Sequence, residues 1–478
     1  MRIALLTYST KPRGGVVHTL ALAEALAAAG EQVDVWTLGR GGDQAFFRRV
    51  DPRVGLRVVP FAARDGETVG ERILRSIESL RASFTPEVYD IVHAQDCISA
   101  NAVDRSIRTV HHLDTFTTPE LVACHERAIV RPLALVCVSA AVAGEVQAGW
   151  GRTATVIPNG VDSARFEAAA SPADPAAVAA VTRWQQSLGR YVLAVGGIEP
   201  RKGSIDLLEA FARVQAAVPD ARLVFAGGET LFDYSDYRSR FEARAAELGV
   251  AYELLGTVDD GDLPSLVAGA AVLSFVSTKE GFGLAAMEAL AAGVPVVARD
   301  LPVLREVFGA AVTYASDVAG IAAALAALLA LRAPARLPRA PLPLAPTPAN
   351  HRVGEKGPKT SVLGPLSPTR SSASDGGSLR GDGSATEWDP EQGRALARTY
   401  SWASAARSHR DLYRMLLATA ATPPGPATAA PAPGPGAAPT PSGPATPSGP
   451  ATAATAAGRA TAATPAGPAT AGRPSSAD

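Results

Sequence analysis

The sequence has little of several features that would point to particular protein classes. It contains three cysteines among 478 residues, Cys97, Cys124 and Cys137, and their spacing matches no zinc site. So sparse and odd a set indicates buried thiols in a reducing compartment rather than a disulfide framework. The 45 Lys and Arg balance 46 Asp and Glu, for a net charge of −1. Charge therefore gives no reason to expect nucleic acid or another polyanion as a partner.

Long apolar runs are lacking as well. The longest, Val318–Leu331, is shorter than the ~18 residues that indicate a membrane span, and we expect a helix packed on a sheet. The apolar run near the N-terminus is too short for a secretory signal peptide. We therefore expect a cytoplasmic protein without a transmembrane segment, for which peripheral contact with a membrane stays open. The excess of Ala, Arg, Pro and Gly is typical of GC-rich bacterial genomes.

Two segments have compositions that cannot build a core. Residues 334–390 are rich in Pro, Ser, Gly and Arg, and residues 419–478 consist almost wholly of Ala, Pro, Gly, Thr and Ser. Such segments bury too little apolar surface to offset the entropy lost on ordering. We predict that both are disordered and that the amphipathic segment between them, 400–416, forms a helix that docks on the folded body.

Strands and helices alternate through the rest of the chain. The first half begins with a strand at Ile3–Thr7, and the pattern restarts with a strand at Tyr191–Gly196 after an Ala-rich link at 162–187. This alternation predicts an α/β fold with two Rossmann-like, doubly wound domains, at 1–165 and 188–331. Two such domains facing each other leave a cleft, which is a common place for a small-molecule site.

The most informative motif is Glu280-Gly281-Phe282-Gly283-Leu284-Ala285-Ala286-Met287-Glu288. It follows a buried apolar segment and passes through a glycine turn into the start of a helix. A helix start presents free N–H groups and the positive end of a dipole, which suit a phosphate. The two carboxylates suit hydroxyl-rich groups such as a ribose and a sugar. The motif predicts a nucleotide-sugar site at the carboxyl edge of a parallel sheet, although glycine turns before helices also occur without ligands.

Other motifs stand in a fixed order around this one. Gly14-Gly15 follows the first strand, without the GxGxxG pattern of dinucleotide-binding proteins. The others, in chain order, are Ile157-Pro158-Asn159-Gly160-Val161-Asp162, Gly196-Gly197-Ile198-Glu199-Pro200-Arg201-Lys202-Gly203, Gly256-Thr257-Val258, Gly293-Val294-Pro295-Val296-Val297 and Tyr400-Ser401-Trp402.

In this order the motifs resemble those of retaining glycosyltransferases with the GT-B fold, of the family 4 (group 1) type. The resemblance covers residues 1–331 and 391–416. It implies transfer of a hexose-type sugar from a nucleoside-diphosphate sugar to an acceptor, with retention at the anomeric carbon. The acceptor stays open among a glycan, a lipid and a small molecule, and neither a cofactor nor a metal is implied. The helix at 400–416 would cross back to the N-terminal domain.

The resemblance also assigns catalytic roles. Lys202 matches the lysine that binds the donor diphosphate, where a point charge stabilises the departing phosphate. Many relatives carry an arginine where this chain has Gly197, and Arg201 is the candidate for supplying that charge from a shifted position. Glu280 matches the carboxylate that contacts the donor sugar. His111, at the end of a strand, matches a histidine that contacts the sugar from the N-terminal domain.

The remaining assignments concern donor binding. Glu288 matches the carboxylate that accepts hydrogen bonds from the ribose hydroxyls. The backbone N–H groups of Phe282, Gly283 and Leu284 are expected to face the sugar and the phosphate. Close backbone approach or backbone contact with the donor is expected at four further positions, Gly14, Gly15, Gly197 and Val258.

Two segments could be mistaken for metal sites. The His111, His112, Asp114, Cys124 and His125 set fits no standard metal spacing. The acidic run at 259–262 is expected to form a turn and to N-cap the helix that follows it.

Two other functions stay open. Similar domains serve nucleotide-sugar 2-epimerases, and the glycine at position 197 together with the long tails leaves room for a non-catalytic sugar-nucleotide-binding scaffold. The presence of Lys202, Glu280 and Glu288 favours the transferase.

Overall fold

The structure is a computed structural model. It describes residues 1–114, 116, 118–228, 234–331 and 388–421. The segments predicted to be disordered lie outside the described residues except for 388–390 and 419–421.

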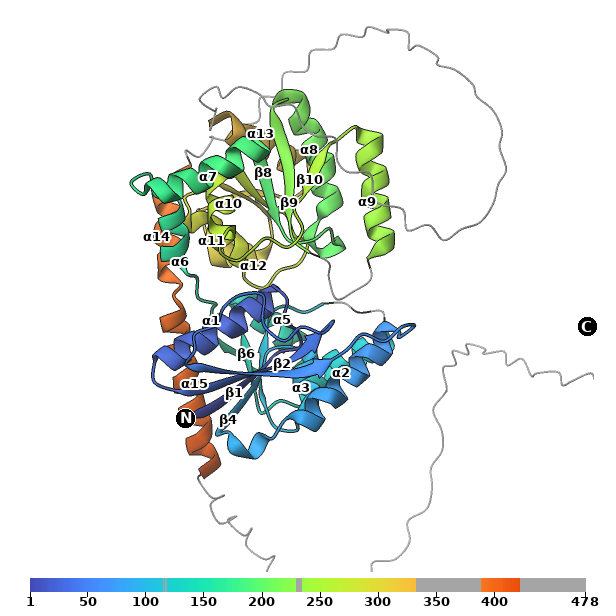
Figure 1. The fold of residues 1–478 in the computed structure, drawn as a ribbon, viewed down its shortest axis with the longest axis vertical. Helices are drawn as coiled ribbons and strands as arrows, with labels where there is room; N and C mark the ends of the chain where they lie inside the picture. The colour runs from blue at the N-terminus through green and yellow to red at the C-terminus, as the bar shows by residue number, and fades with distance from the viewer. Residues whose placement is uncertain (115, 117, 229–233, 332–387, 422–478) are drawn as a thin grey trace, which may run out of the picture. The chain divides into compact units, whose positions relative to one another are not determined.

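The N-terminal domain is built on a parallel sheet of seven strands in the order β3-β2-β1-β4-β5-β6-β7 (Figure 1). The strands are β1 (Arg2–Leu6), β2 (Gln32–Arg40), β3 (Val54–Phe61), β4 (Ile91–Ala94), β5 (Ile107–Val110), β6 (Ala134–Cys137) and β7 (Thr155–Val156). The helices are α1 (Gly14–Ala28), α2 (Val69–Ser83), α3 (Cys97–Ala102), α4 (Pro119–Val130) and α5 (Ala140–Trp150), with a short 3-10 helix at Pro86–Val88.

The C-terminal domain repeats this architecture with six parallel strands in the order β10-β9-β8-β11-β12-β13. The strands are β8 (Arg190–Val195), β9 (Ala221–Ala226), β10 (Tyr252–Leu254), β11 (Val272–Phe275), β12 (Val296–Arg299) and β13 (Thr313–Ala315). The helices are α8 (Ser204–Ala217), α9 (Ser235–Leu248), α10 (Leu263–Gly269), α11 (Leu284–Ala291), α12 (Pro302–Phe308) and α13 (Val318–Leu331), with a 3-10 turn η2 (Pro200–Lys202). The predicted pair of Rossmann-like sheets is confirmed.

Helices cover both faces of each sheet, which explains why the strands are nearly continuous apolar runs. In β1, Ile3 and Leu5 pack with α1 on one face, while Ala4 and Leu6 pack with α2 and α3 on the other. In the second sheet, the predicted helix Val318–Leu331 packs beside α8 and against the sheet. Each sheet reverses its strand order once, between β1 and β4 and between β8 and β11, and ligands bind at such switch points in open α/β sheets.

The segment predicted to link the domains folds into two helices that the sequence analysis did not predict. They are α6 (Ser163–Ala169) and α7 (Pro175–Leu188), and both pack on α10 of the C-terminal domain. Phe166 of α6 is buried in the same core as Tyr191 of β8.

The last described helices, α14 (Pro390–Thr399) and α15 (Trp402–Ala421), return the chain from the C-terminal to the N-terminal domain. In Figure 1, α15 runs beside α1, as predicted for the late amphipathic segment. Tyr413 is fully buried there, and its Oη lies 2.7 Å from Nδ1 of His93. A Cβ on Gly160 would lie 2.3 Å from the backbone nitrogen of Trp402, so the glycine of the Pro-Asn-Gly motif permits this helix to approach.

Two predicted boundaries of disorder were wrong by a few residues. Trp388 packs against the core of the C-terminal domain and Pro390 begins α14, although both fall in the predicted insertion 334–390. Helix α15 continues through 419–421, which were assigned to the tail. In each case packing against the folded body outweighs local composition.

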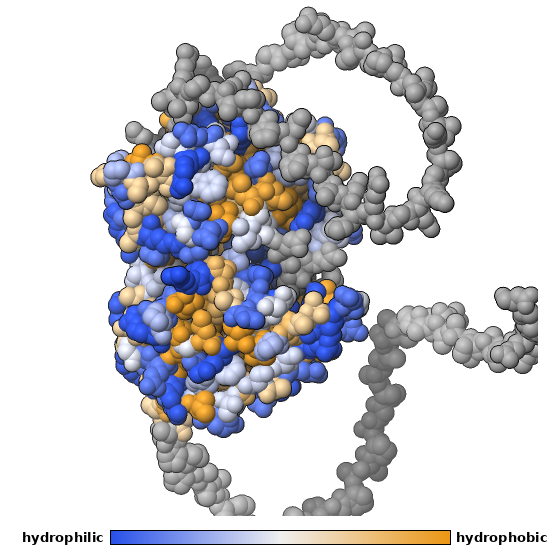
Figure 2. All heavy atoms as spheres, viewed as in Figure 1, coloured by the Kyte–Doolittle hydropathy of each residue, from blue (hydrophilic) through white to orange (hydrophobic). Residues whose placement is uncertain are grey.

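No helix in the described ranges combines the length and the apolar content that crossing a membrane requires. Figure 2 shows that hydrophilic residues cover much of the visible face, with apolar residues gathered in separate patches among them.

Candidate active site

A cavity of about 1750 Å³ is lined by the loops that follow the strands of both sheets. Its lining includes every residue that the sequence analysis assigned to the site: Gly14, Gly15, His111, Gly197, Arg201, Lys202, Val258, Glu280, Phe282, Gly283, Leu284 and Glu288. Their individual roles stay predictions, but the fold brings all of them to one space. Gly256, part of a predicted motif, is not among the lining residues.

Lys202 and Arg201 meet at one carboxylate. The η2 turn follows β8, the motif with Glu280 follows the neighbouring β11, and Thr278 donates a backbone hydrogen bond of 2.8 Å to the carbonyl of Arg201. Lys202 Nζ lies 2.7 Å and Arg201 Nη1 lies 3.1 Å from the same Oε1 of Glu280. These three groups together carry one positive charge, which suits a phosphate, and Glu199 and Asp114 also act on Arg201 through their charges.

The carboxylate of Glu280 is ionised in this setting. Burial alone would raise its pKa, but the charges of Lys202 and Arg201, with the hydrogen bond from Lys202, outweigh burial and lower the pKa to about 2. An ionised, doubly paired carboxylate is well suited to accept hydrogen bonds from sugar hydroxyls. It is a poor proton donor at neutral pH.

The start of α11 faces the cavity beside this corner. Gly283 precedes the helix with φ +102°, and a Cβ there would lie 2.7 Å from the ring of Phe308, so only glycine fits this turn without strain. The first N–H groups of the helix, from Leu284 on, have no carbonyl partner within it. The ring of Phe282 is buried, 5.2 Å from that of Tyr400.

Glu288 lies one turn further along α11 and is half-buried. Among the described residues its carboxylate makes no hydrogen bond or ion pair. Burial raises its pKa to about 8, Arg165 opposes this, and Asp260 and Asp162 add to it. A carboxylate without partners at the cavity wall can take the predicted ribose hydroxyls, whose hydrogen bonds would favour its ionised form.

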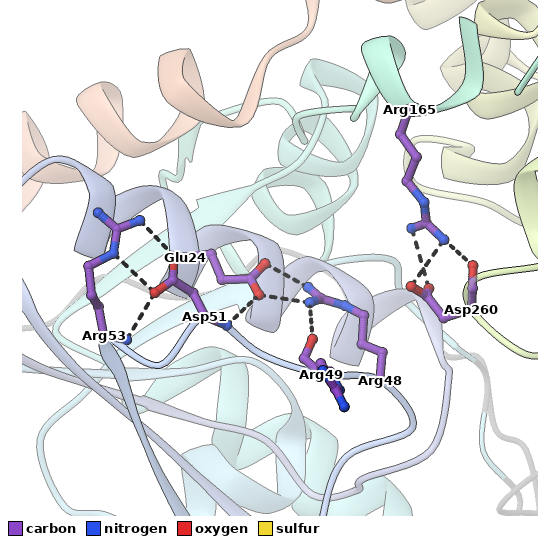
Figure 3. Close-up of polar contacts among 7 residues, drawn as sticks. All are labelled: Glu24, Arg48, Arg49, Asp51, Arg53, Arg165 and Asp260. Atoms are coloured by element: carbon purple, nitrogen blue, oxygen red, sulfur yellow. Dashed lines mark hydrogen bonds and ion pairs between the residues drawn. The ribbon is translucent and has the colours of Figure 1, made fainter. Parts of the chain in front are cut away.

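Arg165 and Asp260 tie α6 to the loop before α10 at the edge of the cavity (Figure 3). Arg165 Nη2 lies 3.0 Å from Oδ2 of Asp260, and it also donates to the carbonyl of Asp260. In the acidic run, Asp259 accepts a hydrogen bond from Gly261 N, which makes the predicted turn. The predicted N-cap is wrong in detail, because Asp262 stands at the cap position but its side chain makes no capping bond.

The loop between β2 and β3 forms another part of the cavity wall. Figure 3 shows two ion pairs that hold it, Arg48 with Glu24 of α1 at 2.7 Å and Arg53 with Asp51 at 2.6 Å. Arg49, whose carbonyl accepts from Arg48 Nη1 at 2.8 Å, is exposed.

His111 lies at the end of β5 with its ring among other rings. The ring packs 4.8 Å from that of His18, and Gly15 fits against it, since a Cβ there would be 3.4 Å away. Burial lowers the pKa of His111 to about 3, so the imidazole is neutral at physiological pH. Its Nε2 is buried with no hydrogen-bond partner in the described ranges. This atom of the neutral ring can form one hydrogen bond with a ligand.

The sequence analysis did not identify all of the glycines that shape the donor side. Gly227 and Gly228 follow β9 and line the cavity next to Thr257 and Val258. A Cβ on Gly228 would lie 2.4 Å from Oγ1 of Thr257, and one on Gly227 would overlap the backbone of Gly196. Consecutive glycines at the end of a strand were the available signal.

Three more polar residues that line the cavity were not assigned to the site. They are Gln95, Arg108 and His125, all buried. An arginine inside the short strand Ile107–Val110 was the available signal, because strands covered on both faces seldom contain charges. Of the described residues, no three or more His, Cys, Asp or Glu are placed to hold a metal ion.

Comparison with known proteins gives matches over both domains. A family model described as "Glycosyltransferase Family 4" matches residues 12–165, and one described as "Glycosyl transferases group 1" matches residues 185–338. Together they span more than half of the chain.

Named relatives and a solved structure agree with these matches. The chain is 29% identical over 361 residues to the phosphatidyl-myo-inositol mannosyltransferase of Mycolicibacterium smegmatis, covering 69% of this chain and 85% of that protein. It is 28% identical over 345 residues to the D-inositol 3-phosphate glycosyltransferase of Jonesia denitrificans, covering 63% and 80%. The sucrose-phosphate synthase of Thermosynechococcus elongatus has a similar fold, with a TM-score of 0.61 at 19% identity over 87% of this chain and 99% of that one.

Proposed function

Because the chain belongs to the group 1, family 4 type of glycosyltransferases with the GT-B fold, we propose that it moves a hexose-type sugar from a nucleoside-diphosphate sugar to an acceptor hydroxyl, with retention at the anomeric carbon. The observation that carries this is the convergence of Lys202 and Arg201 on Glu280, beside the start of α11. The corner combines a net positive charge with free N–H groups, as a diphosphate requires.

In this proposal the donor spans the C-terminal side of the cavity. The diphosphate lies at the start of α11 near Lys202 and Arg201, and the ribose hydroxyls donate to Glu288. The sugar reaches Glu280, with His111 on its other side. The position of Arg201 supplies the second charge that Gly197 cannot.

The reaction proceeds on one face of the sugar. The bond between the anomeric carbon and the diphosphate oxygen breaks, and its electron pair goes to the phosphate. The acceptor oxygen bonds to the carbon on that same face, and its proton passes to the phosphate oxygen. Lys202, Arg201 and the helix start stabilise the charge that develops on the leaving group. No protein nucleophile is required, and the pairing of Glu280 with two cations makes it a weak one.

The test is a thermal-shift screen of the full chain against UDP-, GDP- and ADP-sugars, followed by anomer-resolved NMR of the product. We expect a selective rise in melting temperature with one nucleotide and a product with the donor's anomeric configuration. Lys202→Ala should abolish the shift, whereas Lys11→Ala, which removes a lysine from the opposite wall of the cavity, should keep it.

Other products would contradict this function. A sugar nucleotide epimerised at C2 would indicate an epimerase. Donor binding without turnover of any acceptor, together with a cellular role that survives Lys202→Ala, would indicate a scaffold.

A further inference from the structure

Arg108 is a buried cation with no counter-ion among the residues that the structure describes. It lies in β5, its side chain is 4% exposed, and it lines the cavity. Its Nε and Nη1 have no hydrogen-bond partner, and it forms no ion pair with any residue that the structure describes. A buried charge without a partner is strongly unfavourable, so this arginine calls for an anion from outside the described fold.

The carboxylate whose charge acts on Arg108, that of Asp96, does not serve as that anion. Asp96 follows β4, the strand beside β5, and interacts with Arg108 only through its charge. Its two carboxylate oxygens are occupied by backbone N–H groups, Oδ1 by Ser99 at 2.8 Å and Oδ2 by Tyr8 at 3.0 Å. Asp114, another carboxylate that lines the cavity, accepts from His112 at 2.9 Å.

Two more unsatisfied polar side chains line the same cavity. Gln95 is 2% exposed, and neither atom of its amide has a partner in the described residues. His125 of α4 is 8% exposed with an unpartnered Nε2, and Arg108 helps burial to lower its pKa to about 4. All three line the same cavity.

Arg108 and His125 come from different elements, interact through charge, and both have unpartnered nitrogens among the described residues where they line the cavity. Buried polar groups in folded proteins are nearly always hydrogen-bonded, so unsatisfied groups lying together indicate a missing ligand. A guanidinium with free N–H groups matches the two oxygens of a carboxylate or phosphate. Nε2 of the neutral His125 imidazole can add one hydrogen bond to that oxyanion or to a neighbouring hydroxyl.

The cavity has room for this ligand in addition to the donor. Its volume is about 1750 Å³, whereas small-molecule sites usually measure roughly 300–1,000 Å³. Arg108 belongs to the N-terminal sheet, and the proposed diphosphate corner belongs to the C-terminal sheet. The two cationic sites are therefore built by different domains.

We propose that Arg108, with His125, binds an oxyanion group carried by the acceptor, a phosphate or a carboxylate, and so selects an anionic acceptor. The identification of the ligand as an acceptor rests on the proposed glycosyltransferase function. The binding of the oxyanion itself is independent of it.

The test is a titration of the full chain with inorganic phosphate, and separately with acetate, followed by thermal shift and calorimetry. Lys202→Ala serves as the background, so that the donor corner does not contribute. We expect saturable binding of at least one anion, and a loss of affinity of at least about tenfold in Arg108→Met. Arg49→Met, which removes an exposed arginine from the same cavity, is the matched control and should bind as before.

A purely structural arginine would behave in the opposite way. Because Arg108 is unpaired, Arg108→Met should melt at the same temperature as the parent or higher in anion-free buffer. A lower melting temperature together with unchanged anion binding would overturn the proposal. If Arg108→Met does not fold, His125→Phe replaces it: weaker anion binding supports the site, and unchanged binding overturns it.

The source of the oxyanion is distinguished by two further probes. Glycerol 3-phosphate represents a soluble phosphate ester, and vesicles of phosphatidylglycerol represent a lipid headgroup. Binding of either that is lost in Arg108→Met supports the site and identifies the source. Failure of every anion probe to bind overturns the inference. The proposed function is tested separately, by the rise in melting temperature with a sugar nucleotide and its loss in Lys202→Ala.

Discussion

The two sides of the cavity treat their cations differently. In the C-terminal domain, Lys202 and Arg201 share the carboxylate of Glu280. In the N-terminal domain, Arg108 is more deeply buried than either of them but has no such partner among the described residues. The first side is complete in itself and holds its charges in place before a ligand arrives. The second side is left with unsatisfied groups, which only a ligand or solvent can satisfy.

This difference teaches how to recognise the two kinds of subsite. A preorganised corner needs an internal counter-ion, so its cations and carboxylate occur in motifs on neighbouring loops. An unfilled subsite has no internal partner, so it is visible as buried polar atoms without hydrogen bonds. The following experiments test whether the contrast holds, beginning with the largest expected effect.

Removing Lys202 should have the largest effect. Loss of one preorganised charge at a leaving group typically lowers kcat by about 100–1000-fold, and we expect Lys202→Ala to fall in this range. Steady-state kinetics with the donor found by the thermal-shift screen measure it, with Lys11→Ala as the control. A loss in kcat of less than about tenfold would contradict the contrast between the two sides of the cavity, because catalysis would then not depend on the paired cation Lys202.

The turn before α11 should be the next most sensitive. Gly283→Ala combines a left-handed backbone with a contact of 2.7 Å to the ring of Phe308, and we expect it to cost at least about 2 kcal/mol of unfolding free energy. Gly249 has φ +64° and open space where a Cβ would be added. Gly249→Ala should therefore lower the unfolding free energy only through its left-handed backbone, by about 1 kcal/mol. Urea unfolding measures both. Equal costs would show that the turn is not fixed by packing.

The N-terminal side should be the acid-sensitive one. His409 of α15 is buried, and burial lowers its pKa to about 4, while burial also lowers the pKa values of His18 and His93. Between about pH 6.5 and 4 the unfolded chain binds protons that the folded chain does not, so stability falls as pH falls through this window.

The variant His409→Asn tests this directly. It keeps a donor near the carbonyl of Ala405, which Nδ1 of the histidine contacts at 2.8 Å, but it cannot titrate. Urea unfolding at pH 7.5 and pH 5 should show that the variant loses about 1–2 kcal/mol less than the parent on acidification. The same pH dependence in both chains would contradict the assignment.

Glu288 should give the smallest effect, seen as a pH dependence of donor binding. Its pKa is raised to about 8 in the free protein, and ribose hydroxyls would stabilise the ionised form. Donor affinity should therefore increase with pH, by up to about tenfold per unit, and level off above pH 8. Calorimetry between pH 6.5 and 8.5 measures this, and Glu288→Gln should be flat. A flat profile in the parent would remove Glu288 from the ribose site.

Much of the fold was predictable because local patterns agree with it. The alternation of apolar strands and helices predicted both sheets, and the amphipathic segment at 400–416 predicted that α15 docks on the body. The helices α6 and α7 were not predicted, since their Ala-rich sequence has little apolar contrast along the chain. They form because Phe166 and Leu188 are buried against the C-terminal core, a contact that no local pattern contains.

By itself the sequence determined the two-domain α/β fold, the family resemblance and the residues that line the donor side, because each depends on motifs that are contiguous in the chain. Only the tertiary structure decided that Lys202 and Arg201 share Glu280, that Glu288 has a raised pKa, and that Arg108 stands without a counter-ion. Charge pairing and desolvation depend on which groups from distant elements share a space, and that is set by the packing of one element on another.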